Sequence, residues 1–245
     1  MAGYNWKWGI LFQEPHLGWL ISGALTTVVL ALTSWTIAVV MGTIIGIGRT
    51  VPFAPFRRLA TAYVEVFRNI PLLVQMFLWF FVLPEVLPRE WGRYLKRGVA
   101  HPEFVSAMLC LGFYTASRVA EQVRSGIQSI PTGLSAAARS SGMTIVQTYR
   151  HILMPIGWRI IVPPMTSEFL GIFKNTSIAL TIGVAEITAR SRQIESYTFQ
   201  GYEAFTAATI LYLLVSMTLL LVTRGIEART RIPGMIVRDQ ATNSR

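Results

Sequence analysis

Two long stretches without a single charged side chain constrain this chain more than any other feature. Residues 15–48 and residues 204–223 contain no Asp, Glu, Lys or Arg. Each reaches the roughly 20 apolar residues that cross a hydrocarbon core about 30 Å thick. Charged residues make up only 14% of the chain, compared with about 25% in a soluble domain. The sequence therefore predicts an all-α membrane protein.

The hydropathy pattern predicts five transmembrane helices in a single domain that comprises residues 1–245. They lie at about 17–48, 59–83, 103–124, 150–173 and 204–224. We expect no cleaved signal peptide, because the first apolar region is much longer than the roughly 7–15 residues of a signal-peptide core. The net charge of +10 comes from basic residues scattered between apolar segments. This scatter favours anchoring at a membrane surface and argues against a nucleic-acid partner.

The distribution of basic residues also predicts the orientation, since cytoplasmic loops carry an excess of Lys and Arg. With the N-terminus outside, eleven basic residues fall on the cytoplasmic side and seven on the other. The cytoplasmic set is Arg49, Arg57, Arg58, Arg124, Arg139, Arg150, Arg224, Arg229, Arg231, Arg238 and Arg245. The opposite set is Lys7, Arg89, Arg93, Lys96, Arg97, Arg190 and Arg192. We therefore predict an outer N-terminus and a cytoplasmic C-terminus.

Sequence motifs of enzymes and metal sites do not occur in this chain. A phosphate-binding Gly-x-x-x-x-Gly-Lys-Ser/Thr pattern is absent, which argues against a nucleotide-binding module. His16, His101 and His151 lie far apart and form no zinc-type cluster. Cys110 is the only cysteine, so no disulfide is expected. We predict no metal, no cofactor and no enzymatic activity.

The predicted cytoplasmic loop 131–150 contains a short helix-forming segment. Pro131 ends the third span, and Ser129 or Thr132 is a candidate N-cap for a new helix. The alanines that follow favour a helix, and their small side chains allow a partner to approach closely. Gly142 is expected to end this helix, because glycine accepts the positive φ of a helix C-cap.

The same loop resembles the ATPase-docking loop of ABC importer permeases. The family pattern is Glu-Ala-Ala, three residues, Gly, nine residues and Ile-x-Leu-Pro. Gly142, Ile152 and Pro155 fall in register with it, whereas Ala136 replaces the glutamate and Met154 the leucine. The resemblance assigns the following residues to ATPase coupling: Ala136, Ala137, Ala138, Arg139, Gly142, Ile152 and Pro155.

Further blocks are similar to permeases of polar amino acids, at 67–75, 114–124, 174–177 and 182–184. Residues 163–168 and 118–124 carry a finer resemblance to the longer permease subunit of glutamate/aspartate importers. The resemblance implies the ABC type I importer permease fold, with a cytoplasmic coupling helix, in a bacterial inner membrane. It also implies a second, similar permease that forms a heterodimer with this chain, two ATP-binding ATPase subunits, an extracytoplasmic amino acid binding protein and membrane lipid as partners.

Charged side chains inside a span cost about 2.5–3.5 kcal/mol each, so each needs a partner or a role. Glu121 and Arg124, three residues apart, are expected to form a structural ion pair. Two roles remain open for Arg118. Its guanidinium either receives a substrate carboxylate through two parallel hydrogen bonds or pairs with Glu168 of the fourth span.

The fourth predicted span is the least apolar and contains two consecutive prolines. Glu168 and Asn175 share one face of it, with Gly171 beside them. Polar, interrupted helices occur where they face protein or a water-filled cavity. This face is expected to line the translocation path or the contact with the second permease.

Three functions remain open. The first is a permease subunit of an ATP-driven importer of acidic amino acids, glutamate and aspartate, which works by alternating access. The second is a permease for another polar amino acid, such as glutamine or arginine. An anionic substrate favours Arg118 in the cavity lining, and a cationic one favours Glu168. The third is a membrane scaffold or sensor without transport, although the charges inside the spans argue against a mere anchor.

Overall fold

The computed structural model describes residues 4–230, and side chains up to Gly225. This part is built from helices and loops, so the predicted all-α class is confirmed. The long helices are α1 (His16–Gly48), α6 (Pro102–Gln128), α9 (Met154–Asn175) and α11 (Gly201–Thr230). Of the residues used to predict the orientation, Arg231, Arg238 and Arg245 lie outside the described residues, as does the side chain of Arg229.

The shorter helices connect the long ones. They are η1 (Trp8–Phe12), α2 (Ala54–Asn69), α3 (Leu72–Phe77), η2 (Leu78–Val82), α4 (Leu83–Val86), α5 (Arg89–Arg93), η3 (Tyr94–Gly98), α7 (Thr132–Ser140), α8 (Ile145–Thr148), η4 (Tyr149–Leu153), η5 (Thr176–Ile182) and α10 (Ile187–Thr198). Of these, η1 and η5 are 3₁₀-helices, and η2, η3 and η4 are π-helical turns.

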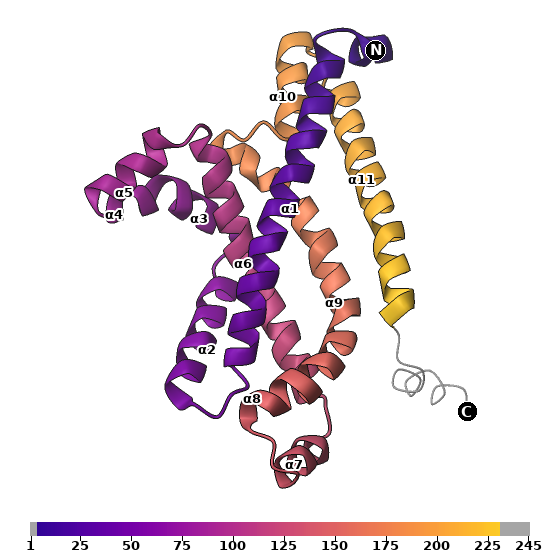
Figure 1. The fold of residues 1–245 in the computed structure, drawn as a ribbon. Coiled ribbons are helices and arrows are strands. Elements are labelled where there is room, and N and C mark those ends of the chain that lie inside the picture. The colour runs from indigo at the N-terminus through magenta and orange to yellow at the C-terminus, as the bar shows by residue number, and fades with distance from the viewer. Residues whose placement is uncertain (1–3, 231–245) are drawn as a thin grey trace.

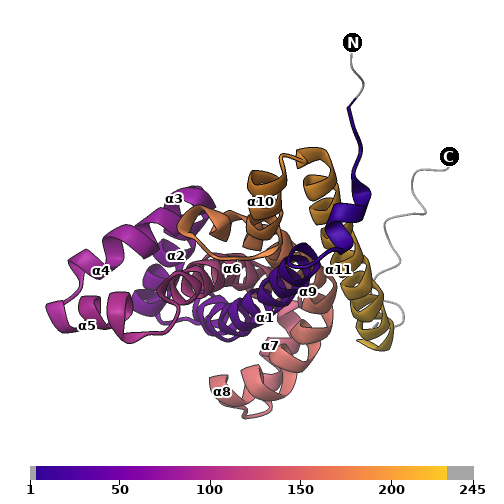
Figure 2. The same ribbon diagram turned by 90° about the horizontal axis from the view of Figure 1, so that it is seen from above.

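The molecule is elongated along α1, with different elements at its two ends (Figure 1). The N-terminal segment and α10 lie at one end, and α7 and α8 project from the other. Seen from above, α3 to α5 form a lobe on one side of the α1–α6 pair, and α11 lies on the other side (Figure 2). By length and composition, α1 and α11 are each able to cross a membrane. The five crossings therefore stay a prediction.

Glycines allow α1 to pack closely along α6. A Cβ atom on Gly42 would lie 2.5 Å from Cγ1 of Val119, and one on Gly46 would lie 2.6 Å from Cβ of Val123. Such distances are far inside normal van der Waals contact, so any larger residue at these two positions would push the helices apart. Close backbone approach through small residues is typical of helix pairs in membranes.

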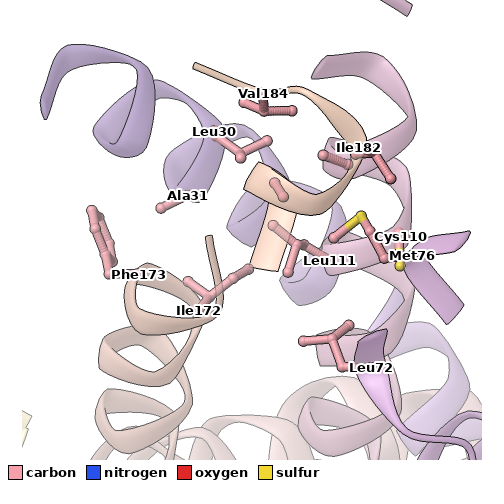
Figure 3. Packing of buried hydrophobic residues seen from close by; sticks show 12 residues of the cluster. Leu30, Ala31, Leu72, Met76, Cys110, Leu111, Ile172, Phe173, Ile182 and Val184 are labelled. Carbon is pink, nitrogen blue, oxygen red and sulfur yellow. The ribbon is translucent and has the colours of Figure 1, made fainter. Parts of the chain in front are cut away.

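A buried apolar cluster joins α1, α6, the end of α9 and η5 (Figure 3). Its labelled members are Leu30, Ala31, Leu72, Met76, Cys110, Leu111, Ile172, Phe173, Ile182 and Val184. A second cluster, around Val119, Val123 and Ile161, continues the contact between α6 and α9 towards the α7 end. These two clusters fix the positions of the elements that carry the polar residues described below.

The region predicted as the second span, 59–83, is not one straight helix. α2 ends at Asn69, and the helical stretch 72–86 leaves it at an angle of 104°. Ile70 is extended, with ψ 129°, because the ring of Pro71 disfavours helical backbone at the preceding residue. The buried side chain of Gln75 donates to the carbonyl oxygens of Phe67 and Ile70, each at 2.8 Å. It thereby satisfies acceptors that the end of α2 leaves open.

Candidate functional site

The candidate coupling element consists of α7 and α8, which stand out from the bundle (Figure 1). Between residues 131 and 147 only Ala138 is buried and Ser135 half-buried. Ala136, Ala137 and Arg139 are all exposed. Because the exposed alanine side chains are short and apolar, another protein can approach the backbone of α7 closely.

The end of α7 follows the glycine-based geometry expected from the sequence. Gly142 has φ 85°, in the left-handed region that favours glycine. Its amide donates to the carbonyl of Arg139 at 3.0 Å, and the amide of Met143 donates to the carbonyl of Ala138 at 3.1 Å. These two bonds form a Schellman motif. The prediction that Gly142 ends the helix is confirmed.

The start of α7 differs from the prediction. Pro131 occupies the N-cap position, and no side chain accepts a hydrogen bond there. Thr132 is already inside the helix, and the hydroxyl of Ser129 instead donates to the carbonyl of Gly126 at 2.8 Å. The expectation of a Ser or Thr cap at this helix is therefore wrong. Ser129 is the C-cap of α6, and its hydroxyl bonds backward along the chain and is therefore not a cap of α7.

A capping box that the sequence analysis overlooked begins α8. The amide of Gln147 donates to Oγ1 of Thr144 at 3.2 Å, and the amide of Thr144 donates to Oε1 of Gln147 at 2.8 Å. The Thr-x-x-Gln pattern was a visible signal for it. At the base of this element, the Tyr149 hydroxyl donates to Oγ1 of Thr50 at 3.1 Å. That bond links the projecting element to the end of α1.

The two halves of the predicted coupling motif lie in different places. Residues 136–142 lie on α7 and its cap, in the projecting part. Ile152 belongs to the π-helical turn η4, and Pro155 lies in the first turn of α9. The second half of the motif therefore forms the root through which α7 and α8 connect to the bundle.

Glu121 is the centre of a cluster of arginines at the α7 end of the molecule. It accepts hydrogen bonds from Arg124, as predicted from their spacing, and from Arg49 at the end of α1. Nη1 of Arg68 lies 3.8 Å from Oε2 of the same carboxylate. The sequence did not predict the contacts of Arg49 and Arg68 with Glu121, because these arginines lie on other helices, far from Glu121 along the chain.

The structure shows the second of the two contacts considered for Arg118, the ion pair with Glu168. Its Nε donates to Oε2 of Glu168 at 2.5 Å and so joins α6 to α9. The side chain of Glu168 is 11% exposed, whereas that of Arg118 is 47% exposed. Glu168 therefore lies between the helices, while half of the Arg118 side chain remains accessible.

Gly171 and Asn175 are half-buried and continue along α9 from Glu168. No atom lies within 4 Å of the position that a Cβ of Gly171 would take, so this part of the helix borders open space. An open, largely apolar cavity of about 390 Å³ lies at the end of α9. Its lining comprises Lys174, Ser177, Thr209, Tyr212, Leu213 and Ser216, rather than the four residues predicted for the path, Arg118, Glu168, Gly171 and Asn175.

Tyr212 is a further residue that the sequence did not single out. Its hydroxyl donates to Oε2 of Glu186 at 2.5 Å. The buried carboxylate of Glu186 also accepts from the amides of Thr188 and Ala189, at 3.0 and 2.8 Å, and so caps α10. Tyr212 lies in the uncharged stretch 204–223, where hydropathy alone gave no reason to single it out.

Comparison with known proteins gives three further findings. Residues 38–232 match the family described as "Binding-protein-dependent transport system inner membrane component". The chain is 44% identical over 239 residues to the glutamate/aspartate import permease protein GltJ of Escherichia coli (strain K12), with 94% of this chain and 97% of that protein covered. It is 30% identical over 228 residues to the glutamate/aspartate import permease protein GltK of Escherichia coli O6:H1, with 93% and 99% covered.

A solved structure extends these similarities to three dimensions. It is described as "Crystal structure of an amino acid ABC transporter with histidines" and superposes with a TM-score of 0.78 at 27% identity. The match covers 92% of this chain and 100% of that chain. The helical arrangement is therefore shared along almost the whole length.

Proposed function

This chain belongs to the family of binding-protein-dependent transport system inner membrane components, and we propose that it is the permease subunit of an ATP-driven importer of acidic amino acids. The observation that carries this proposal is the 44% identity to a glutamate/aspartate import permease over nearly the full length of both chains. The exposed guanidinium of Arg118, which is able to bind a carboxylate, supports the same substrate class.

In the proposed mechanism, Arg118 receives a substrate carboxylate on its exposed side. The bond to Glu168 involves Nε, and a guanidinium has five N–H donors in a planar fork. An incoming carboxylate would meet the opposite edge, while Glu168 holds the arginine in place between α6 and α9. Glu168, Gly171 and Asn175 would then form the adjoining wall of the path. Binding and release would alternate as the permease changes between two conformations.

Energy for this change would come from two ATPase subunits that contact α7 on the cytoplasmic side. The exposed alanines support this proposal because their side chains are small, and the exposed Arg139 beside them adds a positive charge to the same surface. A second, similar permease would complete the path as a heterodimer, and an extracytoplasmic binding protein would deliver the amino acid at the opposite end. The N-terminus would lie outside and the C-terminus in the cytoplasm of a bacterial inner membrane.

A second candidate substrate class is a cationic or neutral polar amino acid, such as arginine or glutamine. Glu168 favours the cationic alternative, because a carboxylate beside the path attracts positive charge. The structural relative described with histidines supports it as well. In that case Arg118 would serve to position Glu168 and would not contact the substrate.

Uptake by the reconstituted complex tests the proposal. The chain is assembled with its partner permease, ATPase and binding protein in vesicles, and uptake of glutamate, aspartate, glutamine, histidine and arginine is measured. We expect ATP-dependent uptake of the two acidic amino acids. Selective uptake of glutamine, histidine or arginine would establish the second candidate instead, and failure to transport any of the five would leave a scaffold role.

Variants at Arg118 test the assignment of the substrate contact. We expect Arg118→Gln to lower acidic amino acid uptake by about a hundredfold, since a charge-assisted bidentate contact contributes roughly 3 kcal/mol. Arg118→Lys should retain part of the uptake. Arg89→Gln, at an exposed site on α5, is the matched control and should match the wild type. Equal uptake by Arg118→Gln and wild type, in a complex that remains assembled, would overturn the assignment.

A further inference from the structure

A basic pocket lies at the end of the bundle that carries α7. It is an open cavity of about 400 Å³ between the end of α1, residues 57–65 of α2 and the end of α6. Its charged and polar lining includes Arg49, Arg57, Arg58, Glu65, Arg124 and Gln128. Four guanidinium groups thus face one space together with a single lining carboxylate.

The charges of this pocket are only partly compensated. Arg49 and Arg124 bind Glu121, which holds their guanidinium groups in fixed positions. Arg57 and Arg58 are exposed, and neither has a carboxylate within 4 Å in the described part of the chain. The pocket therefore keeps an excess of positive charge even after Glu65 and Glu121 are counted.

The second observation concerns the three faces of α2. Ala60 and Val64 are buried, on the side that packs against α6. Phe56, Leu59 and Val66 form an exposed apolar face. The remaining polar face carries the arginines of the pocket. A helix with an apolar face and a basic face lies at the boundary between the hydrocarbon core and the headgroups.

We propose that this pocket binds the phosphate group of an anionic phospholipid, whose acyl chains lie against the exposed apolar face of α2. Guanidinium groups bind phosphate through paired, charge-assisted hydrogen bonds. Basic pockets between helices are suited to anionic headgroups at a membrane surface. The adjoining apolar face distinguishes a lipid from free phosphate, because only a lipid uses both surfaces. This site is independent of the substrate and of the path around Arg118.

Lipid binding by the purified full-length chain tests the proposal. The chain is titrated in neutral detergent with phosphatidylglycerol, phosphatidylcholine or inorganic phosphate, and bound molecules are counted by native mass spectrometry. We expect preferential retention of phosphatidylglycerol. Arg57→Gln combined with Arg58→Gln should weaken this retention about tenfold, since each arginine near an anionic surface adds to the attraction. Arg89→Gln with Arg93→Gln on α5 is a control with the same charge change at exposed sites.

Each result of this experiment either supports the proposed lipid site or contradicts it. Loss of phosphatidylglycerol in the pocket variant and full retention in the control support the site. Equal losses of phosphatidylglycerol in both double variants would show that net charge alone causes the binding. That result would overturn the proposal. Binding of inorganic phosphate as tight as that of the lipid would identify a site for free phosphate. If the pocket variant instead keeps its phosphatidylglycerol, the arginines do not hold the lipid and the proposal fails.

Discussion

Gly142 holds a backbone conformation that other residues adopt only with strain. Replacement by alanine at φ 85° should cost about 1 kcal/mol and loosen the Schellman bonds that end α7. We therefore expect Gly142→Ala to reduce ATP-driven uptake and to accelerate hydrogen exchange at the amide of Met143. Gly133→Ala is the matched control, because Gly133 lies inside α7 with open space around it. That change should strengthen the helix, by roughly 1 kcal/mol. Equal losses of uptake in both variants would contradict this reasoning.

At the scale of single residues, the sequence predicted those contacts that local spacing determines. Glu121 and Arg124 lie on neighbouring turns of one helix, so their contact follows from the period of the helix. The contact of Arg118 with Glu168 was one of two open alternatives, because it depends on how two distant helices pack. Arg49 and Arg68 beside Glu121 were not predicted at all. Their positions beside Glu121 depend on how α1 and α2 pack against α6.

At the scale of helices, the bend that Pro71 imposes between α2 and α3 is stabilised by one buried side chain, Gln75. Gln75→Leu would leave the carbonyl oxygens of Phe67 and Ile70 without their donor. Unsatisfied acceptors of this kind should lower the free energy of unfolding by about 2 kcal/mol. Reversible denaturation in mixed micelles measures this change. Gln122→Leu, at a half-buried position of α6, is the matched control and should have little effect. A Gln75 variant as stable as wild type would show that water replaces the lost donor.

The long uncharged stretches predicted α1 and α11 to within a few residues, because hydropathy depends only on composition along the chain. The same signal failed to show the bend at Ile70, where Pro71 stops α2 although the sequence on both sides is helix-forming. Hydropathy also gave no indication of α10, which is too polar and too short to read as a span. Its position depends on the cap by Glu186 and the bond from Tyr212.

At the scale of the whole molecule, the two ends of the bundle carry different chemistry. The α7 end gathers exposed small residues and the arginines around Glu121. At the other end, the hydroxyl of Tyr4 donates to Glu203 at 2.5 Å and so ties the N-terminal segment to the start of α11. Trp6 and Trp8 stack beside it, with ring centroids 5.4 Å apart. Aromatic side chains concentrate at membrane interfaces. Because such aromatic belts occur at both interfaces, these residues mark this end as an interface and leave its side to the prediction from the arginines.

Cysteine labelling from one side of the membrane tests this orientation directly. Cys110 is the only cysteine and is buried, so Cys110→Ala supplies a background without thiols. Phe199→Cys and Val146→Cys then place single thiols at opposite ends of the bundle, where the native side chains are 85% and 74% exposed. With a membrane-impermeant maleimide applied to spheroplasts, we expect Phe199→Cys to react at once.

We expect Val146→Cys to react only after permeabilisation, because the proposed orientation places α8 on the cytoplasmic side with the ATPase. The chain is expressed both alone and with its ATPase, so that protection by the bound subunit is distinguished from protection by the membrane. Labelling of Val146→Cys in intact spheroplasts, with Phe199→Cys protected, would invert the proposed topology and remove α7 from contact with any cytoplasmic ATPase.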